Sequence, residues 1–169
     1  LALINSILDF SKIEDGKMEI VPVQYETLEL ISDLINMISD KAEKKDLLLE
    51  LKIDEKLPRT LYGDDVRVRQ IVGNLLTNAV KYTREGKLTL VIQKLEVPDE
   101  PENVMLHVEV IDTGIGIRQE DMGKLFESFQ RLDEEKNHNV EGTGLGISIV
   151  QSLLKMMGSS LGVESEYGK

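Results

Sequence analysis

Amide side chains along one face of a predicted helix are the first feature of this sequence that could do chemistry. The segment from Gly63 to about Tyr82 has helical periodicity, and its polar stripe consists of Gln70, Asn74, Asn78 and Lys81. Asparagine costs roughly 0.5 kcal/mol relative to alanine inside a helix, so its repeated use indicates a role beyond solubility. An asparagine oxygen suits Mg²⁺, and a lysine suits phosphate. A solvated helix face fits the same spacing, which alone does not decide between the two.

A carboxylate follows directly on a predicted strand from Val104 to Ile111. It begins the segment Asp112-Thr113-Gly114-Ile115-Gly116, whose glycines let the backbone approach a ligand. A carboxylate in this place can accept a hydrogen bond from an exocyclic amine. Asp-Thr-Gly is also the active-site triplet of aspartic proteases, so the segment by itself is a weak signal.

Three alternating glycines stand immediately before the last predicted helix, in Gly142-Thr143-Gly144-Leu145-Gly146. They free the backbone amides, and a helix N-terminus adds its positive dipole end, which together suit phosphate oxygens. A flexible hinge would explain one glycine but not three. The spacing is not that of a dinucleotide fingerprint. A Walker A loop is absent too, because Gly86-Lys87 and Gly123-Lys124 lack a glycine five positions earlier.

The elements that must position these residues alternate irregularly, which favours a two-layer α/β sandwich of the α+β class, with a mixed sheet packed on about three helices. Besides the helix after Gly63, apolar periodicity predicts four helices: from Leu1 to about Ile13, from a cap at Thr27 to about Lys45, a short one after Gly116 through Phe126, and from Leu145 to Met157. Strands are predicted over Leu47 to Ile53, Lys87 to Leu95 and Val104 to Ile111, with another beginning near Leu161. His107 and Glu109 should face away from the core, so His107 is read as a strand residue without a catalytic role.

Composition narrows the function classes. The 169 residues suffice for one buried domain with a short appendage. Acids outnumber bases 31 to 20 and give a net charge of −11, which argues against a nucleic-acid partner. The chain has no cysteine, no apolar run long enough to span a membrane and no signal peptide pattern. We therefore expect no membrane contact by this piece and a cytoplasmic location.

Taken together and in chain order, these segments resemble the catalytic and ATP-binding domain of sensor histidine kinases. That domain belongs to the superfamily shared with gyrase, the ninety-kilodalton heat-shock chaperone and mismatch-repair ATPases. Residues 69–83 are similar to the family's N box, 112–116 to its G1 box, 125–129 to its F box and 142–146 to its G2 box. Residues 8–14, Leu-Asp-Phe-Ser-Lys-Ile-Glu, are similar to the end of the dimerisation helix that precedes this domain. The resemblance covers nearly the whole chain.

The resemblance implies roles for particular residues. Asp112 would bond the adenine amine, Asn74 would coordinate Mg²⁺, and Arg131 would steady the γ-phosphate during transfer. Asn78, Lys81 and the amides of residues 142–146 would hold phosphates, with Tyr82 packed near the nucleotide. The nucleotide site so implied comprises Asn74, Asn78, Lys81, Tyr82, Asp112, Gly114, Gly116, Phe126, Arg131, Gly142, Thr143, Gly144, Leu145 and Gly146. Of these, Asn74, Lys81 and Arg131 would be catalytic, and the stretch from about Arg131 to Glu141, which includes His138, would be an ATP lid.

The resemblance also implies an organisation and an activity. Residues 1–16 would end the dimerisation helix, and residues 17–169 would form a Bergerat-type ATP-binding domain whose last edge strand is cut. The expected function is transfer of the γ-phosphate of ATP to a histidine on the dimerisation domain, in a two-component phosphorelay with a response-regulator receiver domain. The parent would be a homodimer, which could be membrane-anchored, and this piece could be a monomer. The alternative is a pseudokinase or regulatory module that binds nucleotide without transferring phosphate.

Overall fold

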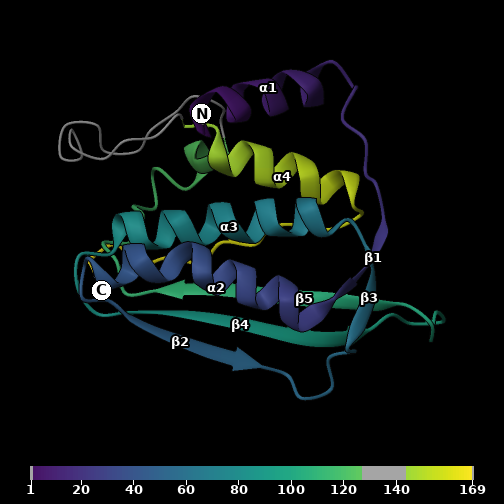
Figure 1. The fold of residues 1–169 in the computed structure, drawn as a ribbon. Helices are drawn as coiled ribbons and strands as arrows, with labels where there is room; N and C mark the ends of the chain where they lie inside the picture. Colours follow the sequence, from purple (N-terminus) through teal and green to yellow (C-terminus); the bar gives the residue numbers. More distant parts are fainter. Residues whose placement is uncertain (1, 127–143, 169) are drawn as a thin grey trace.

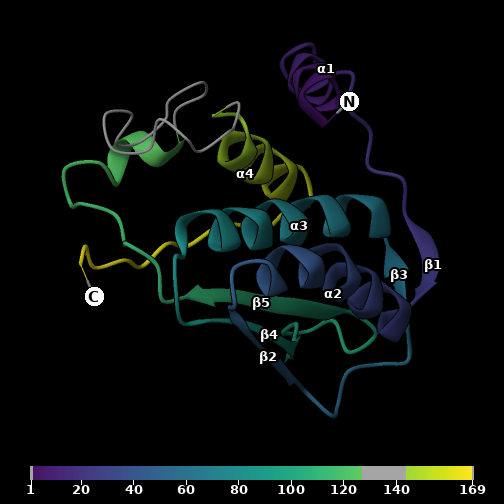
Figure 2. The same cartoon turned by 60° about the vertical axis from the view of Figure 1, so that its left-hand side comes forward.

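The computed structural model describes residues 2–126 and 144–168. One face of a three-stranded sheet is covered by two helices, α2 and α3, and a third, α4, lies along the far side of α3 (Figure 1). A first helix, α1, lies over α4 and is joined to the rest by an extended segment (Figure 2). The predicted α+β class, with a mixed sheet packed on helices and a helical stub before it, is confirmed.

The element order begins with α1 (Ala2–Glu14), β1 (Val23–Glu26), α2 (Thr27–Glu43), β2 (Leu48–Ile53) and β3 (Thr60–Gly63). It continues with α3 (Asp65–Tyr82), β4 (Lys87–Glu96), β5 (Val104–Asp112), the 3₁₀ turn η1 (Gly123–Phe126) and α4 (Gly146–Met156). In the main sheet, β2 runs parallel to β4, and β4 runs antiparallel to β5. Leu88, at the start of β4, is paired with Asp112, so the G1 segment leaves the sheet beside the end of α3.

The core has two parts, and α3 contributes to both. Its residues Val72, Leu76 and Ala79 join α2 and the inward side chains of β4, among them Leu88 and Leu90, which are fully buried. On its other side, Ile71 and Leu75 pack with the apolar face of α4. That second cluster consists of Met18, Ile71, Leu145, Ile149, Val150 and Leu153, with Phe10, Ile13 and Leu75 against it. Helix α3 is therefore held from two directions, which leaves its polar stripe between them.

Two expectations about local structure need correction, and one pair of strands was not expected. Thr27 does not cap α2: the N-cap is Glu26, and the Thr27 hydroxyl instead donates to Pro58 O at 2.6 Å. Residues 159–166 form no strand near Leu161, because none of the described strands lies beside them to supply a ladder. The small antiparallel pair β1–β3 was not predicted, since each strand has only four residues and no clear alternation.

A lysine that follows α2 closes the end of α3. The Lys45 ammonium donates to Val80 O at 2.7 Å and to Lys81 O and Thr83 O at 3.1 Å each. The last carbonyls of a helix have no partner within it and carry its negative dipole end. Lys45 thus stabilises the part of α3 that carries Lys81 and Tyr82.

We predict that Lys45→Ala lowers the free energy of unfolding by about 1 kcal/mol, because it removes charged hydrogen bonds to the carbonyls at the α3 terminus. Urea denaturation followed by circular dichroism measures the change. Lys41→Ala, at an exposed position of α2, is the matched control and should change stability by less than about 0.5 kcal/mol. Equal losses for the two variants would contradict a capping role for Lys45.

Candidate nucleotide site

The two asparagines of the predicted N box face the first turn of α4. A Cβ atom added to Gly146, the first residue of α4, would lie 3.8 Å from Asn78 Nδ2 and 4.0 Å from Asn74 Oδ1. Both asparagines are half-buried. The structure thus brings together residues more than sixty positions apart, at the helix end where backbone N–H groups and the helix dipole favour an anion. The two asparagines and Gly146 therefore lie side by side.

Asp112 lies at the exposed end of β5 with one oxygen held by its own loop. The Gly114 N–H donates to Asp112 Oδ1 at 2.8 Å, and the buried Thr83 hydroxyl lies 3.5 Å from the same atom. That hydroxyl donates to Ala79 O at 2.7 Å, and having a single proton, it offers Asp112 at most a weak contact. Oδ2 takes part in none of the hydrogen bonds found among the described residues. The carboxylate is oriented yet keeps an acceptor for an amine.

Gly114 brings this loop against the end of α3. A Cβ atom on Gly114 would lie 2.6 Å from Asp112 Oδ1 and 2.8 Å from Tyr82 O, too close for any other residue. The Ile115 N–H also points at Tyr82 O, at 3.4 Å. The absence of a side chain at Gly114 therefore sets how near Asp112 comes to the N-box helix.

Gly116 serves a different contact. It has a φ of +70°, and a Cβ atom there would collide with the backbone of Glu166 and lie 2.9 Å from the Cα of Tyr167. The Gly168 N–H donates to Ile115 O at 3.0 Å, and the Ser165 hydroxyl oxygen accepts from the Ile117 N–H at 2.9 Å. The C-terminal segment is thereby held against the G1 loop. The role that the structure shows for Gly116 is to allow this packing.

The structure places some of the other predicted site residues and not others. The Lys81 ammonium sits 4.9 Å from the centre of the Tyr82 ring, within cation–π range, at the C-terminal end of α3. Phe126 is half-buried at the end of η1, which contacts α4. Leu145 is fully buried in the second core cluster, and Gly144 before it has a φ of +72°. Arg131, Gly142 and Thr143 lie outside the described residues, as do His138 and the predicted lid.

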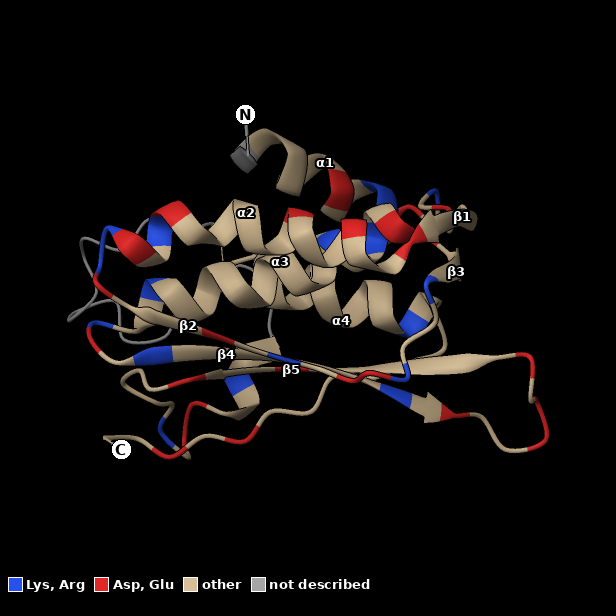
Figure 3. Cartoon of the chain, turned by 60° about the horizontal axis from the view of Figure 1, so that its bottom comes forward, with Lys and Arg blue, Asp and Glu red and all other residues tan. Residues whose placement is uncertain are grey.

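The donor groups at this site suit a metal ion whose ligands are mostly water molecules and the phosphate oxygens of a nucleotide. In residues 2–126 and 144–168, no three acidic, histidine or cysteine side chains gather closely enough to hold a metal ion. Acidic side chains are instead spread over the helices, the strands and the β4–β5 loop (Figure 3). One amide oxygen, that of Asn74, is a sufficient protein contribution for Mg²⁺ bound mainly by water and phosphate oxygens.

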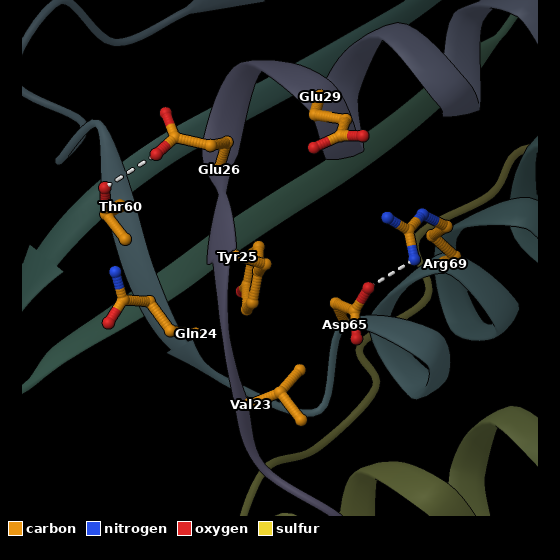
Figure 4. Close-up of a pocket in the computed structure, with 8 residues that line it drawn as sticks. All are labelled: Val23, Gln24, Tyr25, Glu26, Glu29, Thr60, Asp65 and Arg69. Atoms are coloured by element: carbon orange, nitrogen blue, oxygen red, sulfur yellow. Dashed lines mark hydrogen bonds and ion pairs between the residues drawn. The ribbon is translucent and has the colours of Figure 1, made fainter.

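A hollow lies away from these residues, at the N-terminal turn of α3 (Figure 4). Its volume is about 310 Å³, and Tyr25, Asp65 and Arg69 are among the residues that line it. Burial, with the nearby Asp65 charge, raises the pKa of Tyr25. Burial tends to lower the pKa of Arg69, but its ion pairs with Asp65 and Asp33 raise it overall. Arg69 is thus already paired with Asp65 and Asp33. Asn78 is more than two helical turns beyond Arg69 along α3.

Comparison with known proteins identifies the family. Residues 63–169 match the family described as histidine kinase-, DNA gyrase B-, and HSP90-like ATPase. This chain belongs to that family. The matched range begins two residues before the helix that carries Asn74 and Asn78, and it includes Asp112 and Gly146.

Curated relatives and solved structures show which proteins of this family the chain resembles. The chain is 40% identical over 168 residues to hybrid signal transduction histidine kinase B of Dictyostelium discoideum, covering 99% of this chain and 8% of that protein. It is 38% identical to the sensor protein GacS of Pseudomonas syringae pv. syringae, covering 100% of this chain and 18% of that protein. Among solved structures, full-length ShkA in complex with AMPPNP aligns with a TM-score of 0.82 at 27% identity, over 99% of this chain and 33% of ShkA. The chain therefore corresponds to a small part of its curated relatives and to the ATPase fold of histidine kinases.

Two residues that shape the site received no role from the sequence. Thr83 was part of the N-box match, but its buried position between Ala79 and Asp112 depends on the return of the G1 loop. Lys45 lies in a polar run, Lys44-Lys45-Asp46, where no pattern separates it from its exposed neighbours.

Among the described residues, none of the helices combines the length and apolar composition that crossing a membrane requires.

We predict that Gly146→Ala separates binding from folding. A methyl group at Gly146 would meet both asparagines at ordinary contact distance, and alanine favours helix, so stability should stay the same or rise slightly. The methyl would, however, occupy the space where a phosphate would approach the α4 amides, so affinity for ADP should fall, by roughly tenfold if one charged hydrogen bond is lost. Thermal unfolding and titration calorimetry measure the two effects.

The matched control is Gly162→Ala, where a Cβ atom would have nothing within 4 Å. This variant should keep both stability and ADP affinity. Unchanged ADP affinity in Gly146→Ala would contradict the placement of phosphate at the start of α4.

Proposed function

We propose that residues 17–169 bind ATP with Mg²⁺ and deliver its γ-phosphate to a histidine on the dimerisation domain of a two-component sensor kinase, with residues 1–16 forming the end of that domain's helix. The observation that carries the proposal is the meeting of Asn74, Asn78 and the N-terminus of α4. It supplies metal-binding and phosphate-binding groups at one point, with an adenine acceptor, Asp112, beside the C-terminal end of α3.

Each group has a distinct task in this proposal. Asp112 Oδ2 accepts from the exocyclic amine of adenine, while Gly114 keeps the carboxylate from turning. Asn74 provides a ligand to Mg²⁺, which neutralises charge on the phosphates, and Asn78 and the amides of residues 142–146 bind phosphate oxygens. Lys81, held beside Tyr82, adds a cation near the nucleotide. Arg131 is assigned to the γ-phosphate by resemblance to the family.

Transfer is favoured over hydrolysis by the chemistry of Asn74. In the hydrolysing members of the superfamily, the first N-box position is a glutamate that activates water as a general base. An amide has no such basicity, so water is not activated here and the phosphate remains for a protein acceptor. A pseudokinase that binds nucleotide without transfer is the second candidate, and measured phosphotransfer in the parent protein separates the two.

The wider setting follows from the relatives and is likewise part of the proposal. The similar proteins include hybrid and sensor histidine kinases, which supports a parent with a dimerisation domain and a receiver-domain partner. We propose a homodimeric parent that acts on the cytoplasmic side. ATP binding by this chain, in turn, is supported by its membership of the ATPase family.

Titration of the chain with ADP, with and without Mg²⁺, tests nucleotide binding directly, and GDP serves as the control nucleotide. ADP should bind more tightly with Mg²⁺, and GDP should bind weakly, because its ring presents a carbonyl where adenine presents the amine. Absence of binding at millimolar ADP would contradict the proposal, as would equal affinity for the two nucleotides.

We predict that Asn74→Ala removes most of the effect of Mg²⁺ on ADP affinity while metal-independent binding through Asp112 persists. The fold should be retained, since alanine is the better helix former. In a parent with its acceptor histidine, phosphotransfer should fall sharply because charge on the phosphate is no longer neutralised. Calorimetry and phosphoryl transfer from labelled ATP measure these effects.

Asn36→Ala is the matched control, because Asn36 is exposed on the helix α2. It should leave the Mg²⁺ dependence and the transfer rate unchanged. If Asn74→Ala behaves in the same way as this control, then Asn74 is not the metal ligand.

A further inference from the structure

A chain of hydrogen bonds joins α1 to the nucleotide-binding helix. Gln70 Nε2 donates to Asp9 Oδ2 at 2.8 Å, across 61 positions of sequence. The other end of the same amide, Gln70 Oε1, accepts from Arg67 Nη1 at 2.8 Å. Both ends of the Gln70 side chain are therefore engaged. Although Gln70 stands first in the polar stripe, its amide serves α1 and α3 and not the site formed by Asn74 and Asn78.

The segment between α1 and β1 is hydrogen-bonded to the N-terminal end of α3, the end nearer Gln70. Asp64, only 3% exposed, accepts from the Arg67 N–H through Oδ1 as the N-cap of α3. Its other oxygen, Oδ2, accepts from the Val21 N–H at 2.8 Å. Met18, on the same segment, is buried against α4. The segment that joins α1 to β1 is thus held to the start of α3 by a hydrogen bond and to α4 by apolar packing.

Apolar packing alone would not fix how α1 sits on the domain. Phe10 and Ile13 contact the second core cluster, but such contacts are not directional and tolerate sliding or rotation of a helix. The bond between Asp9 and Gln70 has a preferred length and direction, so it selects one register of α1 on α3. Gln70 stands one turn before Asn74 on the same face of α3, which places this contact next to the nucleotide groups.

We propose that Asp9 and Gln70 form a clasp that sets the orientation of α1, the end of the dimerisation helix, on the nucleotide-binding helix, and that both residues are positioning residues for phosphotransfer. The role in transfer rests on the kinase function proposed above. The clasp itself concerns only the placement of α1 and does not depend on nucleotide. Arrangement of donor and phosphate acceptor controls the rate of a transfer reaction, because misplacement by about 1 Å can cost on the order of a hundredfold.

The chemistry of the pair allows a variant that breaks the clasp and a second that restores it. In Gln70→Glu, the new carboxylate still accepts from Arg67 but faces the carboxylate of Asp9 with no donor between them. Adding Asp9→Asn supplies an amide that donates to Glu at position 70. Asp9→Asn alone keeps an oxygen that accepts from Gln70, so it should be close to wild type. Gln93→Glu, on the exposed side of β4, is the control for added charge.

Amide hydrogen exchange in the 169-residue chain reports the clasp directly. A helix of 13 residues is marginal on its own, so protection of the α1 amides measures its docking. Gln70→Glu should reduce that protection by about tenfold, the loss expected for a charged hydrogen bond, while ADP affinity stays unchanged. The double variant should recover the protection. Undiminished protection in Gln70→Glu, or equal loss in Gln93→Glu, would overturn the clasp.

Phosphotransfer in a full-length kinase carrying this chain tests the positioning role. At saturating ATP, Gln70→Glu should change the transfer rate at least fivefold without changing the KM for ATP, and Asp9→Asn in the same protein should restore it. A rate that is unchanged, or a loss that Asp9→Asn fails to rescue, overturns the positioning role. Failure of the kinase proposal is a different result, namely no ADP binding by the unaltered chain.

Discussion

The structure depends on α3 being packed from two sides. Val72, Leu76 and Ala79 bind it to the sheet and α2, while Ile71 and Leu75 bind it to α4. A helix fixed in this way cannot turn, so the narrow polar stripe between its two apolar faces keeps a constant direction. That direction places Asn74 and Asn78 at the first turn of α4, where Gly146 leaves space beside both amides. The phosphate-binding site that we propose follows from this packing, without a metal-binding cluster of acidic side chains among the described residues.

The same helix connects the site to its surroundings at both ends. At its C-terminus, Lys45 holds the last carbonyls, and Gly114 allows the loop that carries Asp112 to pack against Tyr82. At its N-terminus, Asp64 caps the helix and holds the segment that leads from α1, and Gln70 contacts α1 itself. The groups that would read adenine, bind phosphate and set the placement of α1 therefore lie along one rigid element.

Much of this arrangement could be predicted from the sequence, and the exceptions have physical reasons. Helical periodicity located α3 and α4, and the asparagine stripe and spaced glycines pointed to a polyphosphate, because these residues are poor choices for their elements unless a ligand needs them. The contact of Gly146 with Asn74 is a tertiary distance that local patterns do not contain. Thr27 fits the composition of a cap, yet its hydroxyl finds a better partner in Pro58 O. The strand expected near Leu161 has the right residue types, but a strand forms only beside a partner. Gln70 was assigned to the correct stripe, and its partner, Asp9, became visible only once α1 was placed.

The most direct test is a crystal structure of the chain with ADP and Mg²⁺. The account predicts adenine with its amine at Asp112 Oδ2, the metal on Asn74 Oδ1 and the phosphates at the first turn of α4. Nucleotide found elsewhere, for example in the hollow lined by Tyr25 and Arg69, would contradict the account, as would a bound metal that makes no contact with Asn74.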